Sequence, residues 1–278
     1  MASRVLIAGC GDLGCALGTL LSARGLQVYG MRRNLAALPP GLHGVAGDVT
    51  RAETLGGLAH LDPHVLVYCV SADAQSDLSY RTHYVDGLRH VLEALRGATA
   101  LRHVFFVSST RVYGQPGDAV LSESDPALPA DFGGERLLEG ERLLASHPFG
   151  YTVLRLSGIY GPGRRWLINM AADPSRWPPH NAWSNRIHRD DAAGFMAFLV
   201  QRVLEGLPVD DCYLVTDDCP VPQHEVLRWL AGRLGVDVGS MESPLPAGGK
   251  RLSNARLRGT GFELQYPDYR AGYATLLP

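Results

Sequence analysis

The sequence contains no apolar run that approaches the ~20 residues a helix needs to cross a bilayer. Its start does not follow the pattern of a signal peptide, because Arg4 leads directly into a strand pattern and a glycine turn. No long basic run is present, and the formal net charge of -2 disfavours nucleic acid or an anionic membrane as the main partner. We therefore expect a cytoplasmic protein whose partners include neither nucleic acid nor a membrane.

Cysteine is scarce, and its spacing forms no C-x-x-C pair. The 5 cysteines are odd in number, which suits reduced thiols in a cytosolic fold better than a disulfide framework. We expect no structural metal site, and we expect free thiols at Cys10, Cys15, Cys69, Cys212 and Cys219.

The 278 residues, 46% of them hydrophobic, suffice for one large domain or two smaller ones. Short apolar runs alternate with amphipathic stretches, which is typical of an α/β fold with a Rossmann-type, doubly wound parallel sheet. Strands are expected at residues 4–8, 26–31, 65–70, 103–107, 151–156 and 212–215. Helices are expected at residues 12–24, 78–96, 134–146, 191–205 and 223–234, the fourth capped by Asp190 or Asp191.

Composition changes after Gly161, because residues 161–188 bring together tryptophans, prolines and arginines. Such a segment suits a partly irregular pocket wall better than a central strand. We predict a Rossmann domain over residues 1–160 and a smaller, interleaved C-terminal substrate region over residues 161–278, with residues 186–216 returning to the Rossmann core.

The most informative motif is Gly9-x-Gly11-x-x-Gly14, which follows the first strand pattern and opens a helical one. Gly9 permits a tight turn, Gly11 lets the backbone approach a pyrophosphate, and Gly14 allows the helix to pack closely on the strand. The helix that begins with Asp12 and Leu13 directs free N–H groups and a positive dipole end at phosphates. In this context the motif predicts a dinucleotide site, and the alternative is a bare glycine turn.

The second expected strand ends at Arg32 and Arg33, where NAD-binding chains usually carry an acidic residue for the ribose 2′-hydroxyl. Guanidinium groups can hold a 2′-phosphate with charge-assisted hydrogen bonds, which favours NADP over NAD. In the alternative interpretation, one or both arginines lie on a solvated loop.

Four further positions belong to the predicted cofactor site. Residues 43–48 read as another short strand, after which Asp48 either lies beside the adenine or caps the next turn. The predicted cofactor-binding residues also include Val70, Ser71 and Tyr160.

A second cluster, Ser108-Ser109-Thr110-x-Val112-Tyr113-Gly114, follows the strand expected at 103–107. Strands of an open parallel sheet present such carboxyl ends to a ligand. Three further segments match motifs of one known family: Arg155-Leu-Ser-Gly-Ile-Tyr160-Gly-Pro-Gly163, Asn185-Arg-Ile-His188-Arg-Asp190-Asp191 and Lys250-Arg251-Leu-Ser253-Asn254-x-Arg256-Leu257. With the glycine motif, they make the chain resemble the NAD(P)-dependent epimerase/dehydratase superfamily, the extended and atypical short-chain dehydrogenase/reductases, over nearly its whole length.

The resemblance implies that the hydroxyl of Ser109 hydrogen-bonds the substrate oxygen and that a Tyr-x-x-x-Lys pair supplies the proton. The lysine of such a pair lowers the pKa of the tyrosine, so that phenolate forms near neutral pH. Here the nearest match has Phe132 for the tyrosine and Arg136 for the lysine. Tyr113 and Tyr160 have no basic residue four positions on, so the chain is an atypical member.

Other groups could move the proton or bind the substrate. His188 is a candidate because an ordinary imidazole titrates near neutrality, and a histidine held in packing is the alternative. Glu135, Glu139 and Glu141 lie on one expected helix, either as a general acid or base or as a solvated face paired with Arg136 or Arg142. An anionic substrate group could be held by Arg164, Arg165 and Arg186, which could equally be surface charges.

The hypothesis from the sequence is an NADP(H)-binding oxidoreductase or epimerase-like protein for a small carbonyl, alcohol or sugar-nucleotide ligand. In turnover, Ser109 polarises the reacting oxygen, Thr110 supports it, and His188 or a carboxylate-held water moves the proton. The alternative is a non-catalytic NADP-binding redox sensor or scaffold, which Phe132 and Arg136 favour. A homodimer is one assembly that the sequence leaves open.

Overall fold

The computed structural model describes residues 2–115, 117, 119–239 and 243–277. The chain divides into two compact units, and each is built from several separate segments. The first unit comprises Met1–Gly114, Ala127–Arg155 and Ala192–Tyr213. The second comprises Gln115–Pro126, Leu156–Asp191 and Leu214–Pro278.

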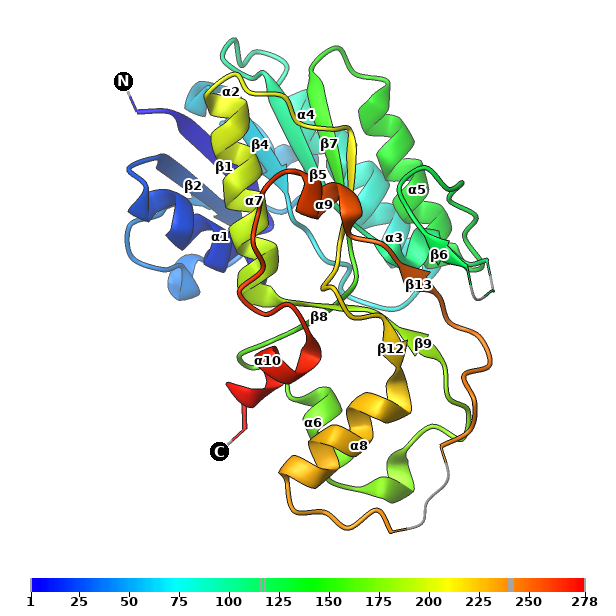
Figure 1. Ribbon diagram of the computed structural model, residues 1–278. Coiled ribbons are helices and arrows are strands. Elements are labelled where there is room, and N and C mark those ends of the chain that lie inside the picture. The colour runs from blue at the N-terminus through cyan, green and yellow to red at the C-terminus, as the bar shows by residue number, and fades with distance from the viewer. Residues whose placement is uncertain (1, 116, 118, 240–242, 278) are drawn as a thin grey trace. The chain divides into compact units, whose positions relative to one another are not determined.

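The first unit is organised around a parallel sheet, which has 7 strands among the described residues (Figure 1). The strand order is β11-β7-β5-β4-β1-β2-β3. The chain therefore reverses direction in the sheet between β1 and β4, as in Rossmann folds, and the predicted α/β class is confirmed. The strands are β1 (Arg4–Ala8), β2 (Gln27–Arg32), β3 (His43–Ala46), β4 (Val65–Tyr68), β5 (His103–Ser109), β7 (Gly150–Leu156) and β11 (Cys212–Val215).

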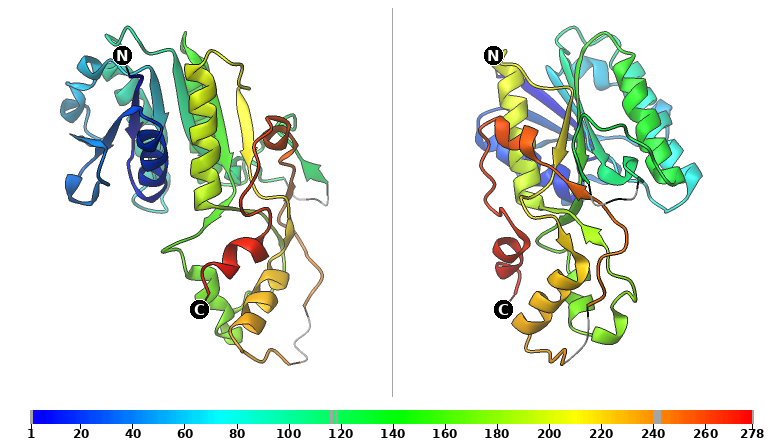
Figure 2. Two further views of the ribbon diagram at one scale, coloured as in Figure 1. Left: turned by 60° about the vertical axis from the view of Figure 1, so that its left-hand side comes forward. Right: turned by 45° about the vertical axis from the view of Figure 1, so that its right-hand side comes forward.

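Helices cover both faces of this sheet, as the two views in Figure 2 show. Helices α1 (Asp12–Ala23) and α7 (Arg189–Leu204) lie on one face, and α4 (Gly87–Ala94) and α5 (Phe132–Ala145) lie on the other. Shorter helices join these elements: η1 (Leu35–Ala37), η2 (Ala52–Leu55), α2 (Leu58–Leu61) and η4 (Thr110–Val112). Alternate strand residues form the core beneath α4 and α5, among them Leu6, Leu66 and Phe106, all fully buried.

The helix expected over residues 78–96 is interrupted. It consists of α3 (Asp77–Tyr80), a π-helical turn η3 (Arg81–Asp86) and α4. The hydroxyl of Tyr68 donates a hydrogen bond to the backbone oxygen of His83 inside the π-helical turn. A side chain from the sheet thus donates a hydrogen bond to a carbonyl of the helix, and such insertions accompany π-bulges.

The second unit contains short strand pairs and small helices. Its core joins α6 (Trp166–Ala171) to α8 (Gln223–Arg233) and α10 (Tyr269–Ala274), with Trp177, Leu227 and Tyr269 buried between them. The remaining elements are β6 (Val120–Leu121), β8 (Gly158–Tyr160), η5 (Pro174–Arg176), β9 (Trp183–Ser184), β10 (Arg186–His188), β12 (Val221–Pro222), β13 (Arg251–Leu252) and α9 (Ala255–Gly259).

The start of α7 differs from the sequence prediction. The helix begins at Arg189, so neither Asp190 nor Asp191 precedes it as a cap. Instead, the ring Nδ1 of His188 accepts the backbone N–H of Asp190 at 3.2 Å. The carboxylate of Asp191 accepts the backbone N–H groups of Gln265 (2.7 Å) and Tyr266 (2.9 Å), and so fixes the C-terminal segment of the second unit.

Two other expectations concern the whole chain. All five cysteines are free, and the sulfurs of Cys10 and Cys15 lie 3.7 Å apart. Within the described residues, no helix combines the length and the apolar character that crossing a membrane requires.

Candidate functional site

A cavity of about 380 Å³ opens at the carboxyl ends of β1, β2, β3 and β4. It lies at the point where the strand order reverses, which is where open α/β sheets bind their ligands. Its volume falls within the range of small-molecule sites. The lining residues are Gly9, Cys10, Gly11, Met31, Arg32, Arg33, Asn34, Gly47, Asp48, Val49, Cys69, Val70, Ser71, Ala72, Asp73 and His83.

The glycine loop shapes one wall of this cavity. Gly9 has a φ of +88°, and a Cβ there would lie 2.5 Å from the carbonyl oxygen of Cys69. A Cβ on Gly14 would lie 2.7 Å from the carbonyl oxygen of Gly9, so this glycine allows α1 to pack on the loop. The N–H groups of Gly9 and Cys10 donate to the oxygen of Met31, which ties the loop to the end of β2.

Gly11 has a different environment, because a Cβ built on it meets no described atom within 4 Å. The space beside it belongs to the cavity, and α1 begins at the next residue with its first N–H groups unpaired within the helix. A side chain at Gly11 would fill this space. The loop therefore fits the pyrophosphate of a dinucleotide.

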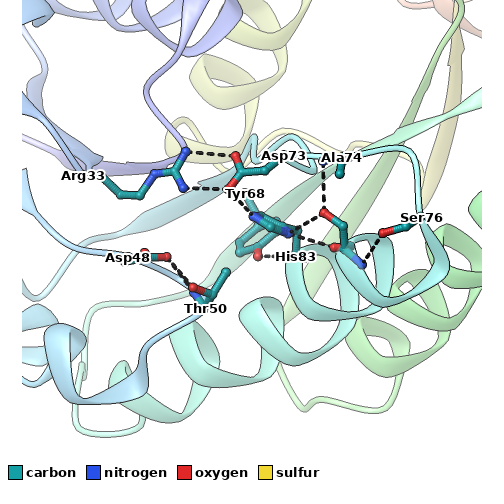
Figure 3. A network of polar contacts seen from close by, with 9 residues as sticks. Arg33, Asp48, Thr50, Tyr68, Asp73, Ala74, Ser76 and His83 are labelled. Atoms are coloured by element: carbon teal, nitrogen blue, oxygen red, sulfur yellow. Dashed lines mark hydrogen bonds and ion pairs between the residues drawn. The ribbon is translucent and has the colours of Figure 1, made fainter.

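Two charged residues of the cavity lining pair with each other, and Figure 3 shows their contact. The guanidinium of Arg33 donates to both carboxylate oxygens of Asp73, with Nη1–Oδ2 at 2.6 Å and Nη2–Oδ1 at 2.9 Å. These hydrogen bonds lower the pKa of Asp73. The Nε2 atom of His83 lies 3.4 Å from the same Oδ2 atom. Asp73 and His83 were not predicted from the sequence, although Asp73 follows β4 at the sheet edge where ligands bind.

Asp48 stabilises a turn, as one of the two interpretations of the sequence expected, and its position beside an adenine stays a prediction. Its carboxylate accepts the backbone N–H (3.0 Å) and the hydroxyl (2.8 Å) of Thr50, so it stabilises the following turn, and it also lines the cavity. Partial burial opposes ionisation, but the Thr50 hydrogen bonds and the nearby Arg33 charge lower the pKa of Asp48.

The other predicted cofactor residues separate into two groups. Arg32 lines the cavity and donates from Nη1 to the oxygen of Ala37 at 3.3 Å; Val70 and Ser71 also line it. Four of the predicted cofactor residues do not line the cavity: Asp12, Leu13, Gly14 and Tyr160.

The strand order and the glycine loop are those expected from the sequence resemblance, and comparison with known proteins decides the family. A family model described as the NAD dependent epimerase/dehydratase family matches residues 5–211. The chain belongs to this family. The resemblance inferred from the sequence is therefore confirmed.

Two curated relatives of this epimerase/dehydratase family member cover most of its length. Protein YeeZ of Escherichia coli (strain K12) is 29% identical over 286 residues, which span 95% of this chain and 97% of that protein. The 3-diazoavenalumate denitrifying reductase of a Streptomyces species is 30% identical over 257 residues, which span 84% of this chain and 82% of that protein.

Solved structures agree on the fold. A Methylobacillus flagellatus structure, provisionally described as an NAD-dependent epimerase/dehydratase, is 49% identical with a TM-score of 0.91, covering 99% of this chain and 98% of that chain. The UDP-glucose 4-epimerase of Thermus thermophilus in complex with NAD has a TM-score of 0.77 at 20% identity, covering 97% of this chain and 96% of that chain. The latter similarity concerns the fold alone.

Ser109 and Thr110 lie where β5 ends, at the same sheet edge as the cavity. The hydroxyl oxygen of Ser109 accepts the backbone N–H of Arg111 at 3.2 Å and so begins the turn η4. Ser109 is half-buried and Thr110 is buried. The Ser109 hydroxyl keeps its hydrogen for donation, since the turn uses only its oxygen as an acceptor.

The place of the missing tyrosine and lysine is occupied by a different charge arrangement. Arg136 donates to both oxygens of Asp77, at 2.7 and 3.1 Å, and to Glu139 at 2.8 Å. The phenol of Tyr80 meets the ring of Phe132 edge-on at 5.5 Å. Lys250, the single lysine of the sequence, belongs to the second unit, so the first unit holds no lysine that could lower the pKa of a phenol.

Arg111, which the sequence analysis did not identify, connects this region to Ser109. Its guanidinium lies over the rings of Tyr80 (5.1 Å) and Phe132 (5.2 Å). Its Nη1 atom donates to the Tyr80 hydroxyl at 2.8 Å, and its Nε atom donates to Asp131 at 2.9 Å. These contacts of Arg111 join separate segments of the chain, so no local sequence pattern predicts them.

The three glutamates of α5 have different surroundings. Glu139 pairs with Arg136, as the interpretation of a solvated face expects, and Glu135 is exposed. Glu141 does not fit that interpretation, because its side chain is only 6% exposed and binds Arg155 and Ser108. Glu141 and Arg155 form a buried structural ion pair beneath the end of β5.

The predicted site residues of the second unit are mostly packed. The ring of Tyr160 stacks on Tyr273 at 4.3 Å between centroids and meets His188 edge-on at 5.2 Å. His188 is 1% exposed, and burial lowers the pKa of its imidazole. Because Nδ1 accepts the Asp190 N–H, the neutral ring carries its proton on Nε2, which has no hydrogen-bond partner among the described residues.

The three arginines predicted to hold an anionic substrate group differ in burial. Arg164 and Arg165 are exposed, and Arg165 donates to the oxygen of Leu276 at 3.3 Å. Arg186 is 4% exposed, lies over the ring of Tyr269 and donates to Ser184. Near it, burial raises the pKa of Asp217 to about 7. Arg186 therefore balances an internal carboxyl group in the second unit.

Proposed function

We propose that this family member is an NADP(H)-dependent oxidoreductase or epimerase-like enzyme that acts on a small carbonyl, alcohol or sugar-nucleotide substrate. One observation carries the proposal. The lining residues at the end of β2 and directly after it include the guanidinium groups of Arg32 and Arg33 and no carboxylate. The reductase name of the Streptomyces relative supports redox chemistry of this general kind.

The preference for NADP follows from the chemistry of these groups. A carboxylate after β2 would accept hydrogen bonds from a ribose 2′-hydroxyl and repel a 2′-phosphate. The side chain of Arg33 is 60% exposed and presents its fork of N–H groups at the cavity, a geometry that phosphate oxygens match. Arg32 adds a second positive charge.

When bound, NADP(H) supplies a nicotinamide ring that accepts or donates hydride. The chain supplies the remaining functions. The Gly9–Gly11 loop and the α1 N-terminus hold the pyrophosphate, and the Ser109 hydroxyl donates a hydrogen bond to the reacting oxygen, with Thr110 beside it. Nε2 of His188, in the second unit, is the proposed proton donor.

Titration of the unmodified protein with NADPH and NADH by calorimetry tests the cofactor assignment. We expect tighter binding of NADPH, and we expect Arg33→Ala to reduce that preference. Equal affinities, or tighter NADH, would overturn it. For the reaction, Ser109→Ala and His188→Gln should each lower turnover by roughly a hundredfold or more, and unchanged rates would remove these residues from the mechanism.

A second candidate function is a non-catalytic NADP-binding sensor or scaffold. The observation that favours it is the engagement of Arg136 by Asp77 and Glu139, which leaves its charge satisfied within the protein. NADPH oxidation over a panel of carbonyl substrates separates the two candidates. Turnover that depends on Ser109 supports the enzyme, whereas binding without turnover supports the sensor.

A further inference from the structure

We propose that Asp73 is a determinant of dinucleotide selectivity, because its carboxylate holds the Arg33 fork that a 2′-phosphate would otherwise bind. This inference rests on the proposed NADP(H) function and deepens it. Asp73 is an internal competitor of the phosphate, and NADP(H) binding requires that Arg33 exchange one anionic partner for another.

The geometry of the pair is that of an arginine with an oxyanion. Two hydrogen bonds of 2.6 and 2.9 Å join the two terminal nitrogens of Arg33 to the two oxygens of Asp73 (Figure 3). A phosphate presents oxygens to the same two nitrogens in the same parallel arrangement. The fork can serve only one of these two partners in this way at a time.

The two residues come from strands that are not neighbours. Arg33 follows β2 and Asp73 follows β4, and the strand order places β1 between them. Both side chains line the same cavity as the Gly9–Gly11 loop that follows β1. The pair therefore forms at the end of the sheet where a dinucleotide binds, and the contact is part of the site.

The Asp73 carboxylate has a second neighbour besides the guanidinium. Nε2 of His83 lies 3.4 Å from Oδ2 of Asp73, and Nδ1 of the same ring lies 2.8 Å from the backbone oxygen of Ser79. The side chains of Arg33 and Asp73 are 60% and 50% exposed, so Arg33 can turn toward a phosphate. Because Asp73 lines the cavity, its negative charge then remains within the site.

This arrangement affects the two cofactors differently. NADH has no 2′-phosphate and can bind with the Arg33–Asp73 pair intact. NADPH has to displace Asp73 from Arg33, and its phosphate then lies near an uncompensated carboxylate. Because the pair is partly exposed, we expect the Asp73→Asn substitution to raise the ratio of NADPH to NADH affinity by roughly two- to fivefold.

The experiment is a double-mutant cycle. Calorimetric titrations with NADPH and with NADH compare the unmodified chain with Asp73→Asn, Arg33→Ala and the double variant. Asp48→Asn is the matched control. It also removes one carboxylate from the cavity, but this carboxylate binds Thr50 and does not hold the Arg33 fork. The readout is the ratio of NADPH affinity to NADH affinity. A substitution that strengthens the binding of both dinucleotides equally leaves this ratio unchanged.

The inference is supported if Asp73→Asn raises the ratio, Asp48→Asn raises it less, and Asp73→Asn has no effect on it in the Arg33→Ala background. It is overturned if Asp73→Asn leaves the ratio unchanged or lowers it while Arg33→Ala still weakens NADPH binding; the proposed NADP preference then stands. If Arg33→Ala leaves the ratio unchanged, the proposed preference fails together with the inference.

Discussion

Arg155 holds both carboxylate oxygens of Glu141 inside the first unit, with Nε–Oε1 at 3.1 Å and Nη2–Oε2 at 2.6 Å. The Ser108 hydroxyl donates to the same Oε1 at 2.6 Å, and the Tyr113 hydroxyl accepts from Nη1 of Arg155. The two charges are 6% and 11% exposed, so water cannot replace either partner. This network fixes the residue that precedes Ser109 on β5.

Removal of one member of the pair should destabilise the fold strongly. Glu141→Leu leaves Arg155 buried without a counter-charge, and we expect the free energy of unfolding to fall by about 3–5 kcal/mol. Urea denaturation measures this loss. Glu139→Gln on the same helix is the control, because that carboxylate is 43% exposed and should contribute under about 1 kcal/mol. Equal small losses in both variants would contradict the assignment.

Two glycines of the dinucleotide loop should respond differently to a side chain. Gly11→Val should leave the stability within about 1 kcal/mol of the parent and abolish cofactor binding, because a Cβ there enters only the cavity. Gly9→Ala should instead lower the stability by about 2 kcal/mol or more, because of its φ of +88° and the Cys69 oxygen 2.5 Å away. Thermal unfolding and cofactor titration distinguish the effects. Retained affinity in Gly11→Val would place the phosphates elsewhere.

The departure from Tyr-x-x-x-Lys predicts weak activity on ordinary alcohols and carbonyls. Phe132→Tyr combined with Arg136→Lys restores a phenol and an ammonium group on the first two turns of α5. We expect the double variant to oxidise NADPH with carbonyl substrates on which the parent is inactive. Phe132→Tyr alone is the control, because its phenol lacks the ammonium. A parent that is already a fast reductase would contradict this prediction, because the proposed donor His188 would then suffice without a tyrosine and lysine pair.

His103 should make stability dependent on pH. Burial lowers the pKa of its imidazole from 6.5 to about 4. Between these pH values the unfolded chain binds the proton and the folded chain does not, so its contribution to stability is lost as the pH falls. The slope from this residue is up to about 1.4 kcal/mol per pH unit. His103→Gln, compared with His60→Gln at an exposed histidine, should flatten the dependence in urea denaturation between pH 7 and 4. An unchanged slope would contradict the assignment.

The strands and the glycine loop could be predicted because their signals are local. A run such as Val65–Tyr68 is apolar because both faces of the sheet are covered, and the glycine spacing is contained in the six consecutive residues 9–14. The Arg33–Asp73 contact joins residues 40 positions apart, and the buried Glu141 of α5 has its counter-charge on β7, at Arg155. Such partners depend on the order of the strands, which no single segment encodes.

The π-helical turn and the start of α7 illustrate the same limit. Periodicity predicted a continuous helix through residues 78–96, but the Tyr68 hydroxyl comes from a strand and takes the His83 carbonyl. Asp191 has the residue type of a helix cap, yet its carboxylate binds the distant N–H groups of Gln265 and Tyr266. In both cases a tertiary hydrogen bond outweighs the local preference.

The alternation of the chain between its units has a consequence for synthesis. The sheet is completed by β11, which covers the outer edge of β7, and residues 157–211 separate the two strands in the sequence. At ribosomal rates of about 5–20 residues per second, this edge stays unpaired for some seconds in each newly made chain. An open edge can pair with another chain, so the nascent protein passes through an interval in which it is prone to aggregate. A gene fragment that stops near residue 160 would prolong that interval indefinitely.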